Sequence, residues 1–300
     1  MKKNLLLTAI LICSAFFTYA QNWEAGKSYY DENKWTEFIP GNMPLVISVP
    51  HGGNILLPDV PVRSCKGAVT VTDTRTIELA MEIQKAFQKK YKVFPSIIIS
   101  HLSRKNVDQN REIEDGSCGN ESMKKPWNQF HNYIDTALAM ATRTYGSTLY
   151  IDLHGHGHTV QRLELGYSLN GTELPDISKK NKQADLAAKS SLNNLFRLNS
   201  KADFEELMIG ENSFGTMITK AGSAAIPSKQ MPVLNEGEKY FNGGYNTRKY
   251  TSSAYPQVFG WQIESNYKGV RDPEGRPVFA KNFSDVIMKF IKENTDIKLP

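Results

Sequence analysis

The chain has 300 residues, of which 40% are hydrophobic and 22% are charged, a composition typical of a globular protein with a sizeable core. Its 36 Lys and Arg residues outnumber its 31 Asp and Glu residues, which gives a net charge of +5. This excess is small and scattered, so it gives no indication of a nucleic-acid partner.

The first 20 residues have the pattern of a secretory signal peptide. Lys2 and Lys3 precede the apolar run LLLTAILICSAFF, and Thr18 and Ala20 are the small residues of a cleavage site. The apolar run is shorter than a typical membrane-spanning helix and no second one follows, although an N-terminal membrane anchor is the alternative. We expect cleavage after Ala20, a periplasmic or secreted protein, and a single α/β domain over residues 21–300 with no membrane span.

The rest of the chain alternates between predicted strands and predicted helices. Near-continuous apolar runs indicate strands that are buried on both faces, and four-residue spacing of apolar residues indicates amphipathic helices. In chain order, we predict a strand at 44–50, a helix at 74–90, a strand at 96–100, a helix at 130–141 that stops at Gly146, strands at 148–154 and 258–265, and a helix capped by Ser284. This order indicates an α/β fold with a mostly parallel or mixed sheet and helices on both faces. Residues 170–250 are predicted to form a peripheral excursion that covers the site.

Each predicted strand ends in a polar residue of a type found in active sites. His51, His101 and His154 follow the first three strands, and Glu264 lies at the end of the fourth. The carboxyl ends of the strands in an open α/β sheet face the ligand crevice. Four such endings predict a site to which several strands contribute.

Two histidines in this set are candidate metal ligands. His51 is followed by two glycines, which let the backbone approach a ligand closely, and His154 ends a strand. Two histidines from neighbouring strands, one carboxylate and an open position for water are the parts of a hydrolytic zinc site. His156 and His158 follow in the segment IDLHGHGH. Three alternate histidines can chelate a metal, but we favour a loop or supporting role for these two.

The carboxylate ligand is open from the residues alone. Asp73 precedes the predicted helix at 74–90, so it is both a candidate ligand and a natural N-cap. Glu78, Asp152 and Glu164 are the other candidates.

Glu264 and two arginines are candidates for catalysis and substrate binding. A glutamate that leaves an apolar strand is partly desolvated, which raises its pKa toward the range of a general base. The alternative is a surface ion pair with Lys268 or Arg271. Arg104 and Arg111 lie in SRKNVDQNR, and the planar guanidinium group binds carboxylates through two hydrogen bonds. A solvated basic loop is the alternative for this segment.

Export would leave Cys65 and Cys118 in an oxidising compartment, where two cysteines can pair. Neither cysteine has the spacing of a metal-binding motif. A disulfide is therefore the role considered for them, and the sequence does not give the distance between them.

Six segments, in order, resemble N-formylglutamate amidohydrolases: SVPHGG, DTRTIELA, SRKNVDQNR, IDLHGHG, GGYNTRKY and QIESNY. Together they extend from Val46 to Tyr267, which is most of the mature chain. Members of this family are zinc hydrolases related in fold to zinc carboxypeptidases and aspartoacylases. The resemblance therefore implies a hydrolase of the zinc-carboxypeptidase-like class with one bound zinc ion.

Residue by residue, the resemblance implies that His51 and His154 bind zinc and that Asp73 is the carboxylate of the site. It makes Glu264 the base. It also assigns four residues to the substrate: Asn110 and Arg111 to its carboxylate, and Arg104 and Arg248 to its carboxylate or the developing oxyanion.

Two positions depart from the related patterns. Zinc carboxypeptidases carry a glutamate ligand three residues after the first histidine, where this chain has Asn54. Lys249 stands where a histidine is expected after the Thr-Arg pair. Asn54 therefore leaves the identity of the third metal ligand open, and Lys249 leaves the identity of the substrate open.

The sequence thus predicts a secreted or periplasmic zinc amidohydrolase. Its substrate is expected to be a small N-acyl amino acid or a peptide with a free carboxylate. A carboxypeptidase or a cell-wall peptide amidase with the same site is one alternative. A non-catalytic binding protein of the same fold is the other.

Overall fold

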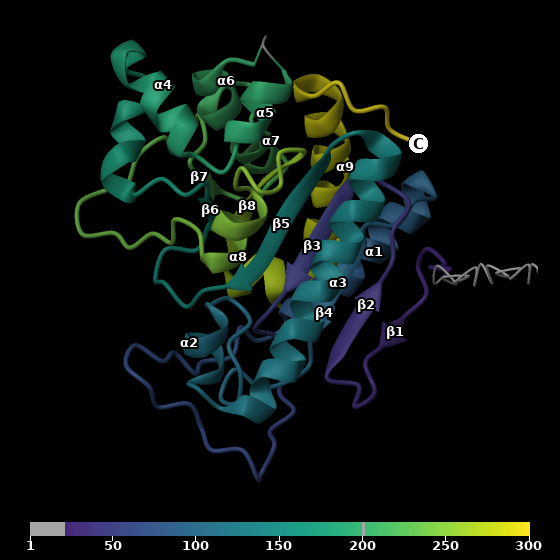
Figure 1. The fold of residues 1–300 in the computed structure, drawn as a ribbon. Helices are drawn as coiled ribbons and strands as arrows, with labels where there is room; N and C mark the ends of the chain where they lie inside the picture. Colours follow the sequence, from purple (N-terminus) through teal and green to yellow (C-terminus); the bar gives the residue numbers. More distant parts are fainter. Residues whose placement is uncertain (1–21, 200–201) are drawn as a thin grey trace, which may run out of the picture.

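The computed structural model describes residues 22–199 and 202–300, and its centre is an eight-stranded mixed sheet (Figure 1). The predicted signal peptide lies outside the described residues. The strands lie in the order β1-β2-β4-β3-β5-β8-β6-β7. Their bounds are β1 (Tyr29–Tyr30), β2 (Thr36–Ile39), β3 (Leu45–Val49), β4 (Ser96–Ser100), β5 (Thr148–Gly155), β6 (Leu163–Gly166), β7 (Ala225–Ile226) and β8 (Val258–Ser265).

The four predicted strands form the parallel centre of this sheet. β4, β3, β5 and β8 are neighbours in that order, and each adjacent pair is parallel. Strands β2 and β6 flank them and run antiparallel to β4 and β8. Every residue of β3, β4 and β8 is buried, which explains their near-continuous apolar sequences. The α/β class and the mixed sheet are confirmed.

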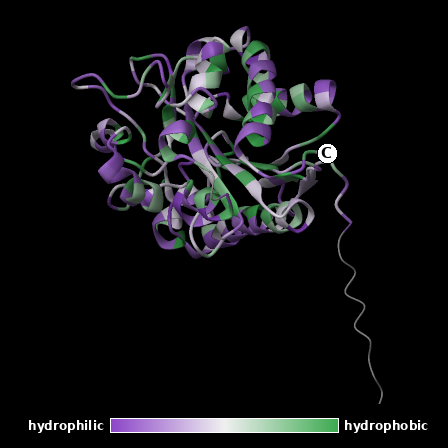
Figure 2. Ribbon diagram, turned by 90° about the horizontal axis from the view of Figure 1, so that it is seen from above, coloured by the Kyte–Doolittle hydropathy of each residue, from purple (hydrophilic) through white to green (hydrophobic). Residues whose placement is uncertain are grey.

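Helices pack on both faces of the sheet. Apolar residues of α1 and α9 join one hydrophobic cluster and those of α3 join another on the opposite face, while the central strands carry many of the hydrophobic residues (Figures 1 and 2). No helix of the described residues is long and apolar enough to cross a bilayer. The bounds are α1 (Thr76–Tyr91), α2 (Ile113–Ser117), α3 (Glu121–Tyr145), η1 (Gly171–Asp176), α4 (Lys180–Lys189), α5 (Asn193–Leu198), α6 (Phe204–Ile209), α7 (Phe214–Lys220), α8 (Tyr245–Tyr250), η2 (Tyr267–Arg271) and α9 (Gly275–Asn294).

The predicted start of the last helix is wrong. Helix α9 begins at Gly275, and Ser284 lies inside it, where its hydroxyl donates to the backbone oxygen of Lys281. The carboxylate of Asp272 accepts hydrogen bonds from the backbone N–H groups of Glu274 and Gly275. Asp272 therefore binds two backbone N–H groups at the start of the helix, the kind of role that the sequence suggested for Ser284.

The region 170–250 is only in part an excursion over the site. Buried residues of α4 to α7 belong to the main hydrophobic cluster, and Phe214 of α7 packs 5.1 Å from Trp261 of β8, measured between ring centroids. The part of this region that lines the candidate site is the short stretch 241–244. The apolar residues of α4 to α7 thus extend the core instead of forming a separate cover.

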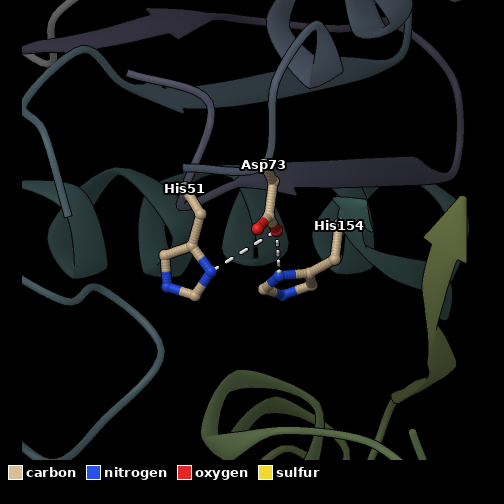
Figure 3. Close-up of side chains that lie close together, drawn as sticks. All are labelled: His51, Asp73 and His154. Carbon is tan, nitrogen blue, oxygen red and sulfur yellow. Dashed lines mark hydrogen bonds and ion pairs between the residues drawn. The ribbon is translucent and has the colours of Figure 1, made fainter. Parts of the chain in front are cut away.

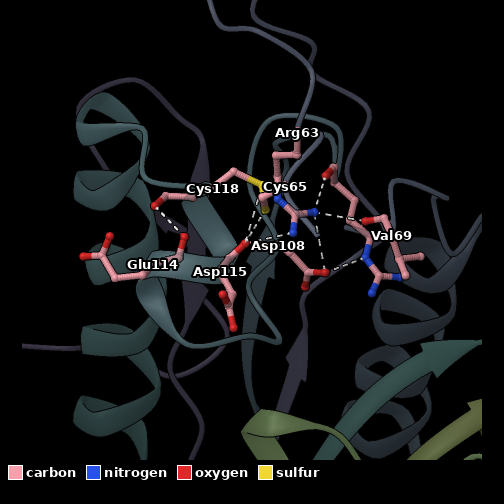
Figure 4. Close-up of a disulfide and its surroundings, with 9 residues drawn as sticks. Arg63, Cys65, Val69, Asp108, Glu114, Asp115 and Cys118 are labelled. Carbon is pink, nitrogen blue, oxygen red and sulfur yellow. Dashed lines mark hydrogen bonds and ion pairs between the residues drawn. A yellow bond between two sulfur atoms is a disulfide. The ribbon is translucent and has the colours of Figure 1, made fainter. Parts of the chain in front are cut away.

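Cys65 and Cys118 form a disulfide, with their Cα atoms 5.5 Å apart (Figure 4). The bond joins the loop before Asp73 to the end of α2. Arg63 lies buried beside it, and its guanidinium group donates to backbone oxygens of Val69, Arg104 and Asp115. A covalent bond and a buried arginine therefore hold this loop in place.

Acidification is expected to destabilise the protein through His131. Its ring lies buried between Trp127 and Tyr250, and its Nδ1 is 2.6 Å from the Tyr250 hydroxyl. Burial, with a smaller contribution from Lys249, holds the pKa of His131 well below its ordinary value. The fold keeps the ring neutral, whereas the unfolded chain protonates it below roughly pH 6.5. Above that pH the free energy of unfolding includes the full contribution of this group. Below it, the free energy of unfolding falls by up to about 1.4 kcal/mol per pH unit.

Urea unfolding of the native protein and of His131→Phe, at about pH 7 and about pH 5.5, measures this effect. Other titrating groups are common to both proteins, so the difference between the two pH slopes isolates His131. We expect a flatter slope in His131→Phe. Equal slopes would show that folding does not shift the pKa of the His131 ring.

Candidate active site

His51, Asp73 and His154 come together at the carboxyl ends of the parallel strands (Figure 3). His51 follows β3, His154 lies at the end of β5, and all three residues are buried. The Oδ2 atom of Asp73 lies 3.0 Å from Nδ1 of His154 and 3.6 Å from Nδ1 of His51. Both rings thus point the same nitrogen toward one carboxylate oxygen.

A second pair of buried carboxylates holds the other nitrogen of each ring. Nε2 of His51 donates to Oδ1 of Asp108 at 2.6 Å, and Nε2 of His154 donates to Oδ2 of Asp152 at 2.8 Å. A hydrogen bond of this kind fixes the tautomer and orientation of a histidine and frees its other nitrogen for a metal. Asp108 is not among the candidate residues that the sequence suggests, and its position in the segment DQNR is the only signal for it.

Asp73 lies in the loop before α1, and its backbone N–H donates to the backbone oxygen of His51 at 3.0 Å. The N-cap residue of α1 is Arg75, so the capping interpretation of Asp73 is wrong. Among the alternative carboxylates, Glu78 pairs with Arg75 on the surface and Asp152 contacts the far side of the His154 ring. Asp73 is therefore the carboxylate that faces both histidines.

Asn54, which replaces the glutamate of zinc carboxypeptidases, is exposed and does not line the cavity. The carboxylate of Asp73 comes instead from a segment 22 residues after His51. Asp73 therefore supplies the carboxylate that Asn54 cannot supply.

The ionisable groups of this cluster alter one another's pKa values. Although burial opposes ionisation of Asp73, the rings of His154 and His51 hold the pKa of its carboxyl below the usual value. Although burial disfavours a charged ring, the carboxylates of Asp152 and Asp73 raise the pKa of His154. A metal ion binds the unprotonated ring, so metal binding must displace a proton and weakens as the pH falls.

The three residues can hold a metal ion. Their ligand atoms lie within 4.8 Å of one another, and Nδ1 of His51 is buried without a hydrogen-bond partner among the described residues. Tetrahedral zinc with bonds of roughly 2.0–2.1 Å places its ligand atoms roughly 3.3 Å apart. The two measured separations from Asp73, 3.0 Å and 3.6 Å, lie on either side of that value.

Glu264 lies beside this cluster, near the end of β8. It pairs in register with His154 of β5 on one side and with Glu164 of β6 on the other. Its side chain is buried, and burial raises the pKa of Glu264 to about 8, with Asp73 and Glu164 acting in the same direction and His154 opposing them. The expected desolvation of Glu264 is confirmed.

The alternative of a surface ion pair for Glu264 is wrong. Its Oε1 accepts a hydrogen bond of 2.8 Å from Nε2 of Gln262. Lys268 is exposed, and the guanidinium group of Arg271 donates to the backbone oxygens of Thr74, His156 and Ser265. The Glu264 carboxylate is therefore free to act in the cavity.

A cavity of about 460 Å³ connects these groups. Most of the predicted site residues line it: His51, Asp73, Arg104, Asn110, Arg111, His154 and Glu264. Arg104 donates from Nε to Asp108, and Nδ2 of Asn110 lies 3.1 Å from Nε2 of His154. Arg248 is the exception, because it is exposed and lines a neighbouring cavity that also includes Arg111.

His156 and His158 lie in the loop after β5 and also line the cavity. The possible ligand atoms of these two histidines and of Glu164 lie close together, as in a metal site. However, Nε2 of His156 donates to the backbone oxygen of Arg162, and its Nδ1 accepts from the backbone N–H of His158. His158 pairs with Glu164 at 2.8 Å and stacks on Phe241. These bonds form a supporting network, because they leave His156 with no free nitrogen.

Replacing Asp108 by asparagine is expected to weaken metal binding by roughly 10–100-fold, because the amide orients the His51 ring less firmly than the carboxylate does. Asp108 is fully buried, and although burial opposes its ionisation, His51 and Arg104 hold the pKa of Asp108 well below its usual range. Competition with a chelating dye measures the zinc Kd. Asp185→Asn, on the exposed side of α4, is the matched control. Unchanged affinity in Asp108→Asn would rule out this supporting role.

No family model matches the sequence, and no curated protein matches it. Among solved structures, the N-formylglutamate amidohydrolase from Ralstonia eutropha JMP134 superposes with a TM-score of 0.51 at 11% sequence identity. The superposition covers 86% of this chain and 98% of that one. The chain therefore has the N-formylglutamate amidohydrolase fold. This confirms the fold that the six sequence segments imply.

A gene product from Agrobacterium tumefaciens is also similar, with a TM-score of 0.46 at 10% identity, over 84% of this chain and 92% of that one.

Proposed function

We propose that this protein is an exported, zinc-dependent amidohydrolase. It cleaves the amide bond of a small N-acyl amino acid with an N-formyl-like acyl group, or of a small peptide with a free carboxylate. The observation that carries the proposal is the pair of histidines that face Asp73 at a cavity also lined by Glu264. The activity named for the Ralstonia eutropha protein of the same fold supports this class of reaction.

Zinc, when bound by His51, Asp73 and His154, acts as a Lewis acid that polarises a carbonyl and lowers the pKa of water. Glu264 accepts the proton of the attacking water. Burial raises the pKa of Glu264 to about 8, so its carboxylate is a stronger base than that of an exposed glutamate. Glu264 then gives the proton to the nitrogen of the leaving amine.

The arginines and Asn110 bind and orient the substrate. Arg111 forms no ion pair with an acid among the described residues, so its guanidinium group can bind the substrate carboxylate through two hydrogen bonds. The hydrogen bond from Arg104 Nε to Asp108 fixes the Arg104 side chain beside the cavity. Its terminal nitrogens then stabilise the oxyanion that forms as the carbonyl is attacked.

The size of the cavity suits a small substrate. Its volume of about 460 Å³ is within the range of small-molecule sites, roughly 300–1,000 Å³. A carboxypeptidase or a cell-wall peptide amidase would use the same residues on a larger chain, and a binding protein would hold the ligand without turnover.

The test uses the mature chain, residues 21–300, stripped of metal and then given one equivalent of zinc. We expect zinc to restore hydrolysis of N-formylglutamate or N-acetylglutamate, with turnover on the order of 1 s⁻¹ or faster for a good substrate. The α-amide of N-formylglutamate is the matched control, because it lacks the carboxylate assigned to Arg111. Stoichiometric zinc without turnover of any N-acyl amino acid or peptide would favour the binding-protein alternative.

A further inference from the structure

A second cavity, of about 780 Å³, lies next to the first, and Arg111 lines both. Its walls carry four cations and two acids: Lys66, Arg111, Arg248 and Lys249, with Glu112 and Asp115. None of the four cations forms an ion pair with an acid within the described parts of the chain. The cavity therefore carries an excess of positive charge, and its cations lack acidic partners among the described residues.

Lys249, like Arg111, is partly buried, whereas Lys66 and Arg248 are exposed. The side chain of Lys249 is half-buried, and its Nζ lies 5.1–5.6 Å from the ring centroids of Trp127, Tyr245 and Tyr250. Ring faces attract a cation, but they replace only part of the hydration that burial removes. Burial accordingly lowers the pKa of Lys249. An anion placed in the cavity would supply the missing counter-charge.

The walls of the second cavity are fixed to the catalytic one. On one side, Lys66 directly follows Cys65 of the disulfide. On the other side, α8 carries Arg248 and Lys249, and the backbone N–H of Asn246 in this helix donates to Oδ1 of Asn110 at 2.8 Å. Asn110 also contacts the His154 ring.

Helix α8 can approach Asn110 this closely because Gly244 precedes it. A Cβ atom at Gly244 would lie 2.2 Å from Nδ2 of Asn110. The position of the cationic helix is thus set by the same asparagine that contacts a metal-facing histidine. A ligand that spans both cavities would meet a preformed surface.

We propose that the second cavity is a subsite for the anionic segment of an acidic peptide, whose scissile amide lies at Glu264 in the first cavity. The proposal rests on the amidohydrolase function and deepens it by naming an acidic peptide as the substrate class. Arg111 lines both cavities and binds the carboxylate nearest the scissile amide. Arg248, which the sequence resemblance assigns to the catalytic centre, and Lys249 then bind the more distant carboxylates.

The experiment measures peptide binding by calorimetry, in the zinc-loaded mature chain carrying Glu264→Gln so that no peptide is cleaved. The probes are N-acetyl-Glu-Glu and N-acetyl-Glu-Gln, which differ by one carboxylate. We expect the first to bind about tenfold more tightly. Adding Lys249→Met, which keeps most of the apolar stem against the rings, is expected to reduce this preference to about twofold or less. The preference should also fall with added salt.

Arg248→Gln, at an exposed position, is the second variant and should reduce the preference even if Lys249→Met fails to fold. Lys289→Met, on the exposed side of α9, removes the same charge at a distance and should leave the preference intact. Equal binding of the two probes, or a preference that survives both changes, overturns the subsite. Zinc-dependent turnover of N-acyl amino acids is measured separately with native Glu264. Turnover without a charge preference refutes the subsite alone, and a preference without turnover refutes the amidohydrolase function alone.

Discussion

Replacing Glu264 by glutamine is expected to leave zinc bound and to lower kcat by a factor on the order of 10²–10⁴. The amide has nearly the shape of the carboxylate and can keep the contact with Gln262, but it cannot accept a proton. Glu264 is not one of the three residues whose ligand atoms face the metal position. Initial rates and zinc content, measured on the same preparation, test both parts of this expectation.

Glu78→Gln is the matched control for Glu264→Gln, because Glu78 lies on the surface in an ion pair with Arg75. It should keep both zinc and activity, and it also tests the alternative ligand that the sequence left open. Full activity in Glu264→Gln would remove Glu264 as the base. Loss of zinc in that variant would instead make Glu264 a ligand.

Replacing Asp73 by alanine is expected to have the second large effect, the loss of stoichiometric metal. Its carboxylate is the group that both histidines face, and without it two ligands remain. The affinity for zinc should fall by more than the roughly 10–100-fold that loss of an outer partner costs. Elemental analysis after dialysis, and the shift in Tm on adding zinc, measure this without any substrate.

Asp59→Ala, at an exposed position in the same loop, is the control for Asp73→Ala. Circular dichroism establishes whether each variant is folded before its metal content is compared. A folded Asp73→Ala protein that still holds one equivalent of zinc at native affinity would mean that another carboxylate completes the site.

The central strands could be predicted from the sequence, and the edges of the sheet could not. β4 and β8 coincide with the apolar runs at both ends, because strands buried on two faces need apolar side chains throughout. β1 and β7 have two residues each, too few to show a period. The start of α9 is not apparent from the sequence, because the side chain that binds its first N–H groups is Asp272, three residues before Gly275.

Some residues of the candidate site could also be predicted from the sequence, and others could not. His51, His154 and Glu264 follow from their places at strand ends, because the strands themselves are easy to recognise. Contacts between segments far apart in the sequence have no recognisable local pattern. Nothing local in the sequence shows that Asp108 meets His51 or that Asn246 meets Asn110, which is 136 residues away.

The disulfide has a consequence for how the site is organised. Residues 65–118 form a closed ring. This ring contains Asp73, which faces both histidines, together with Asp108 and Asn110, which contact one histidine each. Closing a ring of this length removes much of the conformational freedom of the unfolded chain. The bond therefore constrains this segment independently of any bound cation or ligand, and binding does not have to order it.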